Sequence, residues 1–184
     1  MADRRTQILE TAAELFAERG FHGVSVVELG AACGISGPAL YKHFPSKDAV
    51  LAEMLVDISQ DLLRGGRSRS TSVDDPGEAL RLLVAFHVDF ALRHKPLIVV
   101  QDRDWASLPD TAREKVRSLQ RRYVDVWADR LREVHDVLTP RRARAMAHAA
   151  FGLINSTPHS AMLPEPEMRT VLERMALDAL GVPG

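Results

Sequence analysis

Side chains for acid–base and metal chemistry are plentiful in this sequence, but their spacing does not form a catalytic or metal site. The chain holds 7 histidines and 25 acidic residues, the usual ligands and proton carriers of metalloenzymes and hydrolases. It contains no His-x-x-x-His, Cys-x-x-Cys, Gly-x-Ser-x-Gly or phosphate-loop motif. His87 and His94 would lie two helical turns apart, which is too far for one small ion. We therefore predict no catalytic residue, no metal and no cofactor, and expect that the protein is not an enzyme.

Composition favours a soluble, cytoplasmic chain with no membrane partner. Its 184 residues, 46% of them hydrophobic, are enough for a buried core. Cys33 is the single cysteine, which excludes an internal disulfide and favours a reducing compartment. No apolar run approaches the roughly 18 residues of a membrane span, and the first residues lack the apolar core of a signal peptide. The net charge of −1 argues mildly against DNA binding, although a small reading head needs only a few well-placed cations and backbone amides.

The elements that must position any functional residue are predicted to be helices. Ser25, Ser36 and Ser46 are N-cap signals, while Gly20 and Gly34 are helix ends. Together with an apolar stripe in the first segment, they predict helices over about residues 3–19, 25–34, 36–44 and 46–64.

A flexible polar stretch from Gly65 to Ser72 is the clearest candidate boundary. Cap and proline signals after it predict helices over about residues 75–94, 109–138, 139–155 and 167–180, with a short apolar segment up to Trp105. Strand patterns are scarce, so the fold class is predicted to be all-α.

The second and third short helices describe a helix-turn-helix, with the turn at residues 33–36. Gly34 can adopt the left-handed conformation of such a turn, and Ile35 would anchor the corner to the core. Ala31 and Ala32 are small enough to let the two helices approach closely.

The residues around this turn resemble the tetracycline-repressor (TetR) family of transcriptional regulators. The matching strings run from Phe16 through Gly20-Phe21-x-Gly23-x-Ser25 to Leu29, and from Gly34-Ile35-Ser36 to Leu40-Tyr41-x-His43-Phe44-x-Ser46-Lys47. The resemblance covers about residues 4–64. It implies an N-terminal three-helix helix-turn-helix DNA-binding domain at residues 1–46, with a linking helix to about residue 64. It also implies a C-terminal helical ligand-binding and dimerisation domain at residues 47–184.

The resemblance also implies a DNA-contacting surface. Ser25 and Ser36 would offer hydroxyls and capped helix N-termini to phosphates, Tyr41 and His43 would contact the backbone, and Lys47 would add charge. The expected set is Ser25, Ser36, Gly37, Pro38, Ala39, Tyr41, Lys42, His43 and Lys47. Four of them have a structural alternative: helix caps for the two serines, core packing for Tyr41 and a solvated side chain for Lys47.

The expected recognition helix begins without long polar side chains. Gly37, Pro38 and Ala39 carry no long polar side chain, so apolar contact with thymine methyls is the feasible base contact. Lys42 could reach a base or a phosphate. Arg4 and Arg5 form a basic N-terminal arm that could enter the minor groove.

The remainder is expected to bind a small molecule and to pair two subunits. Periodicity provides large apolar and polar side chains for an effector pocket, namely Phe86, His87, Phe90, Gln101, Trp105, Tyr123, Trp127 and Asn155. A four-helix dimer interface is suggested by small residues on one helix and by Val171 and Met175 on the last. The small residues are Ala143, Ala147 and Ala150, together with Ala145 and Ala149. Ordinary packing within the chain is the alternative for these small residues.

The resemblance implies a two-state regulator that binds double-stranded operator DNA as a homodimer. An effector would shift the reading heads away from the spacing of two successive major grooves. Release of repression by the ligand is the family norm, and activation stays open. Residues 92–104 and 152–158 are similar to regulators of acyl-CoA and lipid catabolism, which points to an acyl-CoA or other lipid-like effector. A structural bundle without DNA binding would not need the Tyr-x-His-Phe-x-Ser-Lys string.

Overall fold

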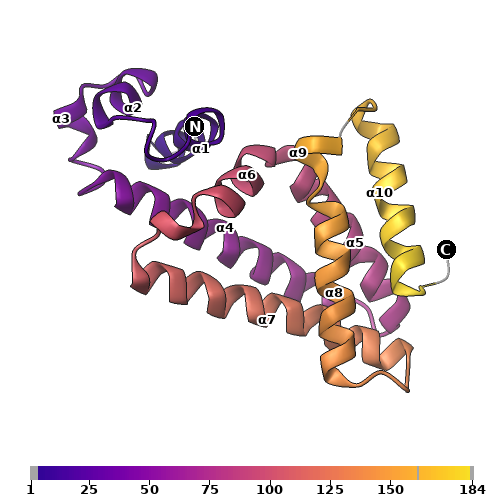
Figure 1. The fold of residues 1–184 in the computed structure, drawn as a ribbon. Helices are drawn as coiled ribbons and strands as arrows, with labels where there is room; N and C mark the ends of the chain where they lie inside the picture. Colours follow the sequence, from indigo (N-terminus) through magenta and orange to yellow (C-terminus); the bar gives the residue numbers. More distant parts are fainter. Residues whose placement is uncertain (1–3, 161, 183–184) are drawn as a thin grey trace. The chain divides into compact units, whose positions relative to one another are not determined.

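The computed structural model describes residues 4–160 and 162–182, and every regular element in these ranges is helical (Figure 1). This confirms the all-α prediction. In chain order the elements are α1 (Arg4–Arg19), α2 (Val26–Ala32), α3 (Gly37–Leu40), α4 (Lys47–Ser70), α5 (Pro76–Arg93), α6 (Lys95–Arg103), the 3-10 turn η1 (Trp105–Ser107), α7 (Asp110–Val134), α8 (Pro140–Ile154), α9 (Thr157–Ser160) and α10 (Glu165–Leu180). None of the described helices is both long and apolar enough to cross a membrane.

The chain divides into two compact units. The head unit comprises Met1–Ile58 and Pro96–Arg117, and the bundle unit comprises Ser59–Lys95 and Ser118–Gly184. This differs from the expected division at residues 46 and 47, because the segment 96–117 belongs with the N-terminal helices. Arg103 at the end of α6 explains part of this grouping, since its guanidinium donates hydrogen bonds to the carbonyls of Phe16 and Ala17 at the end of α1.

The head unit is held by an apolar centre that α1, α2 and α3 share. Ile8, Phe16, Leu29, Leu40 and Phe44 are buried almost completely. Side chains at these spacings fall on the inward faces of short helices, so a few residues per helix are enough to close the core.

In the bundle unit, α5, α8 and α10 pack against one another (Figure 1). Ala143, Ala147 and Ala150 on α8 are buried within the chain itself. These three alanines therefore serve the alternative of intramolecular packing and are not available to the interface expected on α8. The small residues of α8 that remain exposed are Ala145, Ala149 and Gly152.

The predicted boundary at Gly65–Ser72 is wrong, because α4 continues to Ser70. Two glycines explain the continuation. A Cβ at Gly65 would lie 2.3 Å from the Phe86 ring, and one at Gly66 would lie 2.4 Å from the Tyr123 ring. The pair is therefore a site of close packing in the bundle unit, and the packing outweighs the low helix propensity of glycine.

The ends of several other helices differ by a few residues from those predicted from the sequence. Helix α3 ends at Leu40 and is followed by turns, α7 ends at Val134, and α10 begins at Glu165. The short α9 after Ser156 was not predicted. These are places where caps and turns compete closely with a further helical residue.

Candidate DNA-contacting surface and effector site

The turn between α2 and α3 has the predicted geometry. Gly34 has φ of +68°, and its amide donates to the carbonyl of Ala31 over 2.9 Å. The close approach occurs at Gly30 instead of the alanines that follow it, because a Cβ at Gly30 would lie 3.0 Å from both the Gly37 nitrogen and the Ile35 oxygen. Ala31 is exposed. The glycine in the middle of α2 is thus required by the turn.

Ser25 forms the predicted capping box with Glu28. Its hydroxyl accepts a hydrogen bond from the Glu28 amide at 3.2 Å, and its hydroxyl and amide both donate to the Glu28 carboxylate, at 2.6 Å and 2.8 Å. The Ser25 hydroxyl, its amide and nearby Arg19 hold the pKa of Glu28 below its ordinary value. The hydroxyl proton of Ser25 already forms a hydrogen bond to Glu28, so a phosphate that accepts from this hydroxyl would have to replace the Glu28 carboxylate.

The recognition helix α3 presents a small, accessible surface. Ser36 caps it by accepting a hydrogen bond from the Ala39 amide at 3.2 Å. Pro38 and Lys42 are exposed, and Tyr41 is 53% exposed. Exposure at this level removes the alternative that Tyr41 is a core residue.

The remaining residues of the expected set lie deeper. Gly37 is buried against Val27, while Ala39 and His43 are half-buried. Gly37 therefore sets how closely α3 approaches α2 and has no side chain to offer to DNA.

Three cations expected to face DNA are occupied within the head unit. The Lys47 ammonium donates to the carbonyls of Phe21 and Val24, over 2.7 Å and 2.6 Å, and lies 4.3 Å from the Phe21 ring centre. Arg5 pairs with Glu53, donates to the His43 carbonyl and covers the Phe44 ring. Arg4 donates to the Cys33 carbonyl. Arg4 and Arg5 are therefore part of α1 and its packing, in place of the free arm expected, and the phosphate contact of Lys47 stays a prediction.

Aromatic side chains of the bundle unit gather around His87. Phe151 stacks on Tyr123 with ring centres 5.3 Å apart and an angle of 4°, and Trp127 meets Phe151 edge-on at 4.9 Å. The His87 ring lies 4.7 Å from Phe151 and 5.7 Å from Phe90. These five residues form what we call the aromatic cluster.

Polar atoms in the aromatic cluster are incompletely paired. His87 Nδ1 lies 3.2 Å from the Tyr123 hydroxyl, but His87 Nε2, Trp127 Nε1 and the amide oxygen of nearby Asn155 are buried with no hydrogen-bond partner in the described chain. Burial lowers the pKa of His87 to about 4, which the Asn155 side chain opposes, and burial raises the pKa of Tyr123. Both groups are therefore neutral at physiological pH.

The structure brings together most of the expected effector-binding residues. His87, Phe90, Tyr123 and Trp127 belong to the aromatic cluster, and Asn155 lies beside His87. Phe86 also belongs to α5, and the Arg69 guanidinium covers its ring at 4.0 Å from the ring centre. Gln101 and Trp105 belong to the head unit, where Arg117 lies 5.6 Å from the Trp105 ring centre. The other six expected effector-binding residues belong to the bundle unit.

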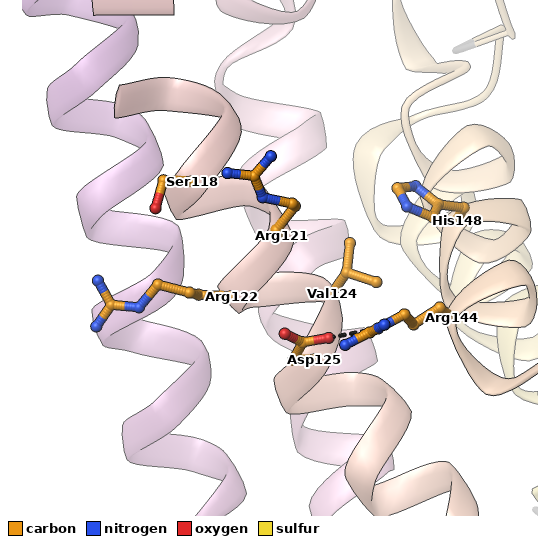
Figure 2. Close-up of a pocket in the computed structure, with 7 residues that line it drawn as sticks. All are labelled: Ser118, Arg121, Arg122, Val124, Asp125, Arg144 and His148. Atoms are coloured by element: carbon orange, nitrogen blue, oxygen red, sulfur yellow. Dashed lines mark hydrogen bonds and ion pairs between the residues drawn. The ribbon is translucent and has the colours of Figure 1, made fainter. Parts of the chain in front are cut away.

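A pocket of about 290 Å³ lies between α7 and α8 in the bundle unit, and sequence reasoning missed it (Figure 2). Arg144 and Asp125 form an ion pair across it, at 2.6 Å. We call it the arginine-lined pocket; its residues are Ser118, Arg121, Arg122, Val124, Asp125, Arg144 and His148. The available signal was the tandem Arg121-Arg122 and the three arginines within residues 141–144, because such runs raise the local density of positive charge along a helix.

No group of three or more metal-binding side chains was found among residues 4–160 and 162–182.

Comparison with known proteins bears on both units. A family model described as "Bacterial regulatory proteins, tetR family" matches residues 8–54, and one described as "Tetracyclin repressor-like, C-terminal domain" matches residues 73–159. The transcriptional repressor KstR2 of Mycolicibacterium smegmatis is 30% identical over 135 residues, which are 72% of this chain and 65% of KstR2. The chain spans 38% to 49% of the length of the first three curated relatives that it matches.

Solved structures share the fold over nearly the whole chain. A TetR-family regulator from Bordetella parapertussis has a TM-score of 0.86 at 25% identity and covers 98% of this chain and 95% of its own. AibR, solved in complex with isovaleryl coenzyme A and operator DNA, has a TM-score of 0.78 at 23% identity, covering 94% and 97%.

The chain has a helix-turn-helix head with a capped recognition helix, followed by a helical unit with its own core. This arrangement is typical of helical transcriptional regulators that carry both domains on one polypeptide. The chain belongs to the TetR family.

Proposed function

We propose that the protein is a transcriptional repressor that binds operator DNA through the head unit. The observation that carries this is the exposed recognition helix: Ser36, Pro38, Tyr41 and Lys42 lie together at the end of a helix-turn-helix whose turn is fixed by Gly34 and Gly30. KstR2 is named a repressor, and AibR was solved with operator DNA. Regulation, in place of catalysis, is the function inferred for the whole chain.

The effector site of this proposal is the aromatic cluster. Buried polar atoms without partners are uncommon in folded proteins and often mark binding sites. His87 Nε2, Trp127 Nε1 and the Asn155 oxygen offer a bound molecule donors and an acceptor among aromatic rings. The thioester carbonyl and acyl chain of an acyl-CoA have this mixed character, and AibR was solved with such a compound. Binding would favour one of two states of the dimer and thereby lower operator affinity.

The dimer of this proposal uses the outward faces of α8 and α10. Ala145, Ala149 and Gly152 lie on the side of α8 opposite its buried alanines, and Val171 and Met175 on α10 are 37% and 51% exposed. Small residues on one helix and apolar ones on its neighbour permit four helices of two subunits to pack closely.

Three variants test the proposal. Lys42→Ala should weaken binding to operator and to random DNA alike, and should make the log–log salt slope shallower by about 1.8 for the dimer, because one phosphate contact is lost in each subunit. Ala149→Glu should give folded monomers with much lower operator affinity, measured by sedimentation and fluorescence anisotropy. Ala147→Glu is its matched control, because it should destabilise the buried face of α8 in the monomer itself. An unchanged salt slope for Lys42→Ala removes Lys42 from the DNA surface, and a dimeric Ala149→Glu places the interface elsewhere.

A further inference from the structure

An exposed valine lies beside the recognition helix. Val27, in the first turn of α2, is 70% exposed. A Cβ at Gly37, the first residue of α3, would lie 3.6 Å from Val27 Cγ2, so the valine borders the start of α3. A β-branched side chain lowers helix propensity, and one that is mostly exposed gains little from burial. The stability of α2 therefore does not account for a valine at this position.

Pro38 extends this apolar surface onto α3. Of the three residues that open the recognition helix, Gly37 is buried, Ala39 is half-buried and Pro38 is exposed. Val27 lies against Gly37 from α2, and Pro38 follows it in the chain. We call these two exposed residues, which flank Gly37, the valine–proline patch.

The patch is continuous with the surface assigned to DNA. Tyr41 follows Pro38 by three residues and still has helical backbone angles, and residues with this spacing lie on one side of a helix. Tyr41 and the next residue, Lys42, are both exposed. An apolar pair with polar neighbours of this kind is typical of an interaction surface.

The start of α2 is not available to a phosphate. The Ser25 hydroxyl and amide both donate to the Glu28 carboxylate, so this helix end already holds an anion. Val27 and Pro38 have no polar side-chain atom to offer to a phosphate or to a base edge. The DNA group that fits them is apolar, and in the major groove that group is the C5-methyl of thymine.

We propose that Val27 and Pro38 together contact the C5-methyl group of one thymine in each operator half-site, which makes Val27 a specificity-determining residue. This contact rests on the function proposed above, binding of operator DNA through the head unit. Tyr41 and Lys42 then hold the phosphate backbone and fix the register, while the valine–proline patch supplies sequence information.

Uracil substitution tests the contact directly, because uracil pairs as thymine does and lacks only the methyl group. The full chain first selects its preferred sequence from a duplex library of about 20 random base pairs, enough for two half-sites. Each thymine of the selected duplex is then replaced by uracil in turn, and affinity is measured by fluorescence anisotropy. One thymine in each half-site should be sensitive, with binding about fourfold weaker for each methyl lost.

Val27→Ala should remove most of this sensitivity. The variant should bind the thymine duplex more weakly than the wild type does, but uracil should then weaken its binding by less than about twofold, because the methyl has lost its partner. Alanine is the better helix former, so the variant should fold. Pro38→Ala should reduce the uracil penalty in the same way. Val137→Ala, the same change at an exposed valine of the bundle unit, is the matched control and should keep the full penalty.

The salt dependence gives an independent measurement. Val27→Ala should leave the log–log salt slope unchanged, because no phosphate contact is lost. A shallower slope would place a phosphate at the valine–proline patch and overturn the inference. It is also overturned if Val27→Ala and Val137→Ala show the same uracil penalty.

The selection step distinguishes this inference from the function on which it rests. If the wild type enriches no sequence from the library, the proposed function falls and the methyl contact falls with it. If the wild type enriches a sequence and binds it equally well with uracil at every thymine position, the repressor stands and only the methyl contact falls.

Discussion

The head unit and the bundle unit differ in how completely their buried polar side-chain atoms are hydrogen-bonded. The described chain has four buried side-chain nitrogen or oxygen atoms without a partner, and three of them surround the aromatic cluster. The fourth, Arg113 Nε in the head unit, belongs to a guanidinium whose Nη2 donates to the carbonyls of Ala106 and Leu108. An unpaired buried polar atom costs about 1–3 kcal/mol. Among the described residues, the buried polar atoms without a partner therefore gather mainly in the bundle unit, where a bound molecule could pair with them.

The largest expected effect concerns His87 and pH. Its pKa is about 4 in the folded chain and 6.5 ordinarily, because burial disfavours the charged ring. Stability from this residue is fully present above pH 6.5 and falls as pH decreases to 4, because the unfolded chain takes up the proton first. At about 1.4 kcal/mol per pKa unit, the wild type should lose about 3 kcal/mol more than His87→Leu over this interval.

Urea denaturation at several pH values measures this difference. The control is His159→Leu, which changes an exposed histidine and should follow the wild type. Equal pH slopes for the wild type and His87→Leu would mean that His87 is not held neutral, and the contrast between the units would lose its main support.

Close packing in the bundle unit gives the next effect. Gly66→Ala places a Cβ 2.4 Å from the buried Tyr123 ring, so it should lower the free energy of unfolding by about 1–3 kcal/mol. Gly152→Ala is the matched control within one chain, since a Cβ there meets nothing within 4 Å, and it should raise the stability of the dissociated chain by about 0.5–1 kcal/mol. If Gly66→Ala also raised stability, α4 would be shown to tolerate bulk beside the aromatic cluster.

The head unit was more predictable from sequence than the bundle unit, for a physical reason. Ser25, Ser36 and Gly34 act within a few residues of themselves, so their caps and turn follow from local spacing. Gly65 and Gly66 look like a linker because their role depends on Phe86 and Tyr123, which are distant in sequence.

The same limit applies to the candidate sites. The arginine-lined pocket needs α7 and α8 side by side, which no spacing within either helix shows. Lys47 was expected to face DNA because sequence does not reveal the carbonyls of Phe21 and Val24 at its ammonium.

Two lysines of the head unit, Lys47 and Lys42, give a third comparison, because only Lys47 donates to the carbonyls of Phe21 and Val24. Lys47→Met should lose two charged hydrogen bonds and a contact with the Phe21 ring, lowering the free energy of unfolding by about 2 kcal/mol. Lys42→Met changes an exposed side chain and should alter stability by less than about 0.5 kcal/mol. Thermal denaturation decides between them. Equal stabilities would mean that Lys47 is available to DNA after all, as its sequence position suggests.

The smallest expected effect separates the two roles of Ser36. Its hydroxyl caps α3 through the Ala39 amide, and it lies on the surface assigned to DNA. Ser36→Ala removes the cap and should cost about 1 kcal/mol of stability, but it could weaken DNA binding through either role. Ser36→Asp distinguishes them, because aspartate caps helices as well as serine while its charge repels a phosphate. Denaturation and operator titration should show near wild-type stability with weakened binding for Ser36→Asp. If Ser36→Asp restores both properties, Ser36 is a cap alone, and the DNA surface of α3 begins at Pro38.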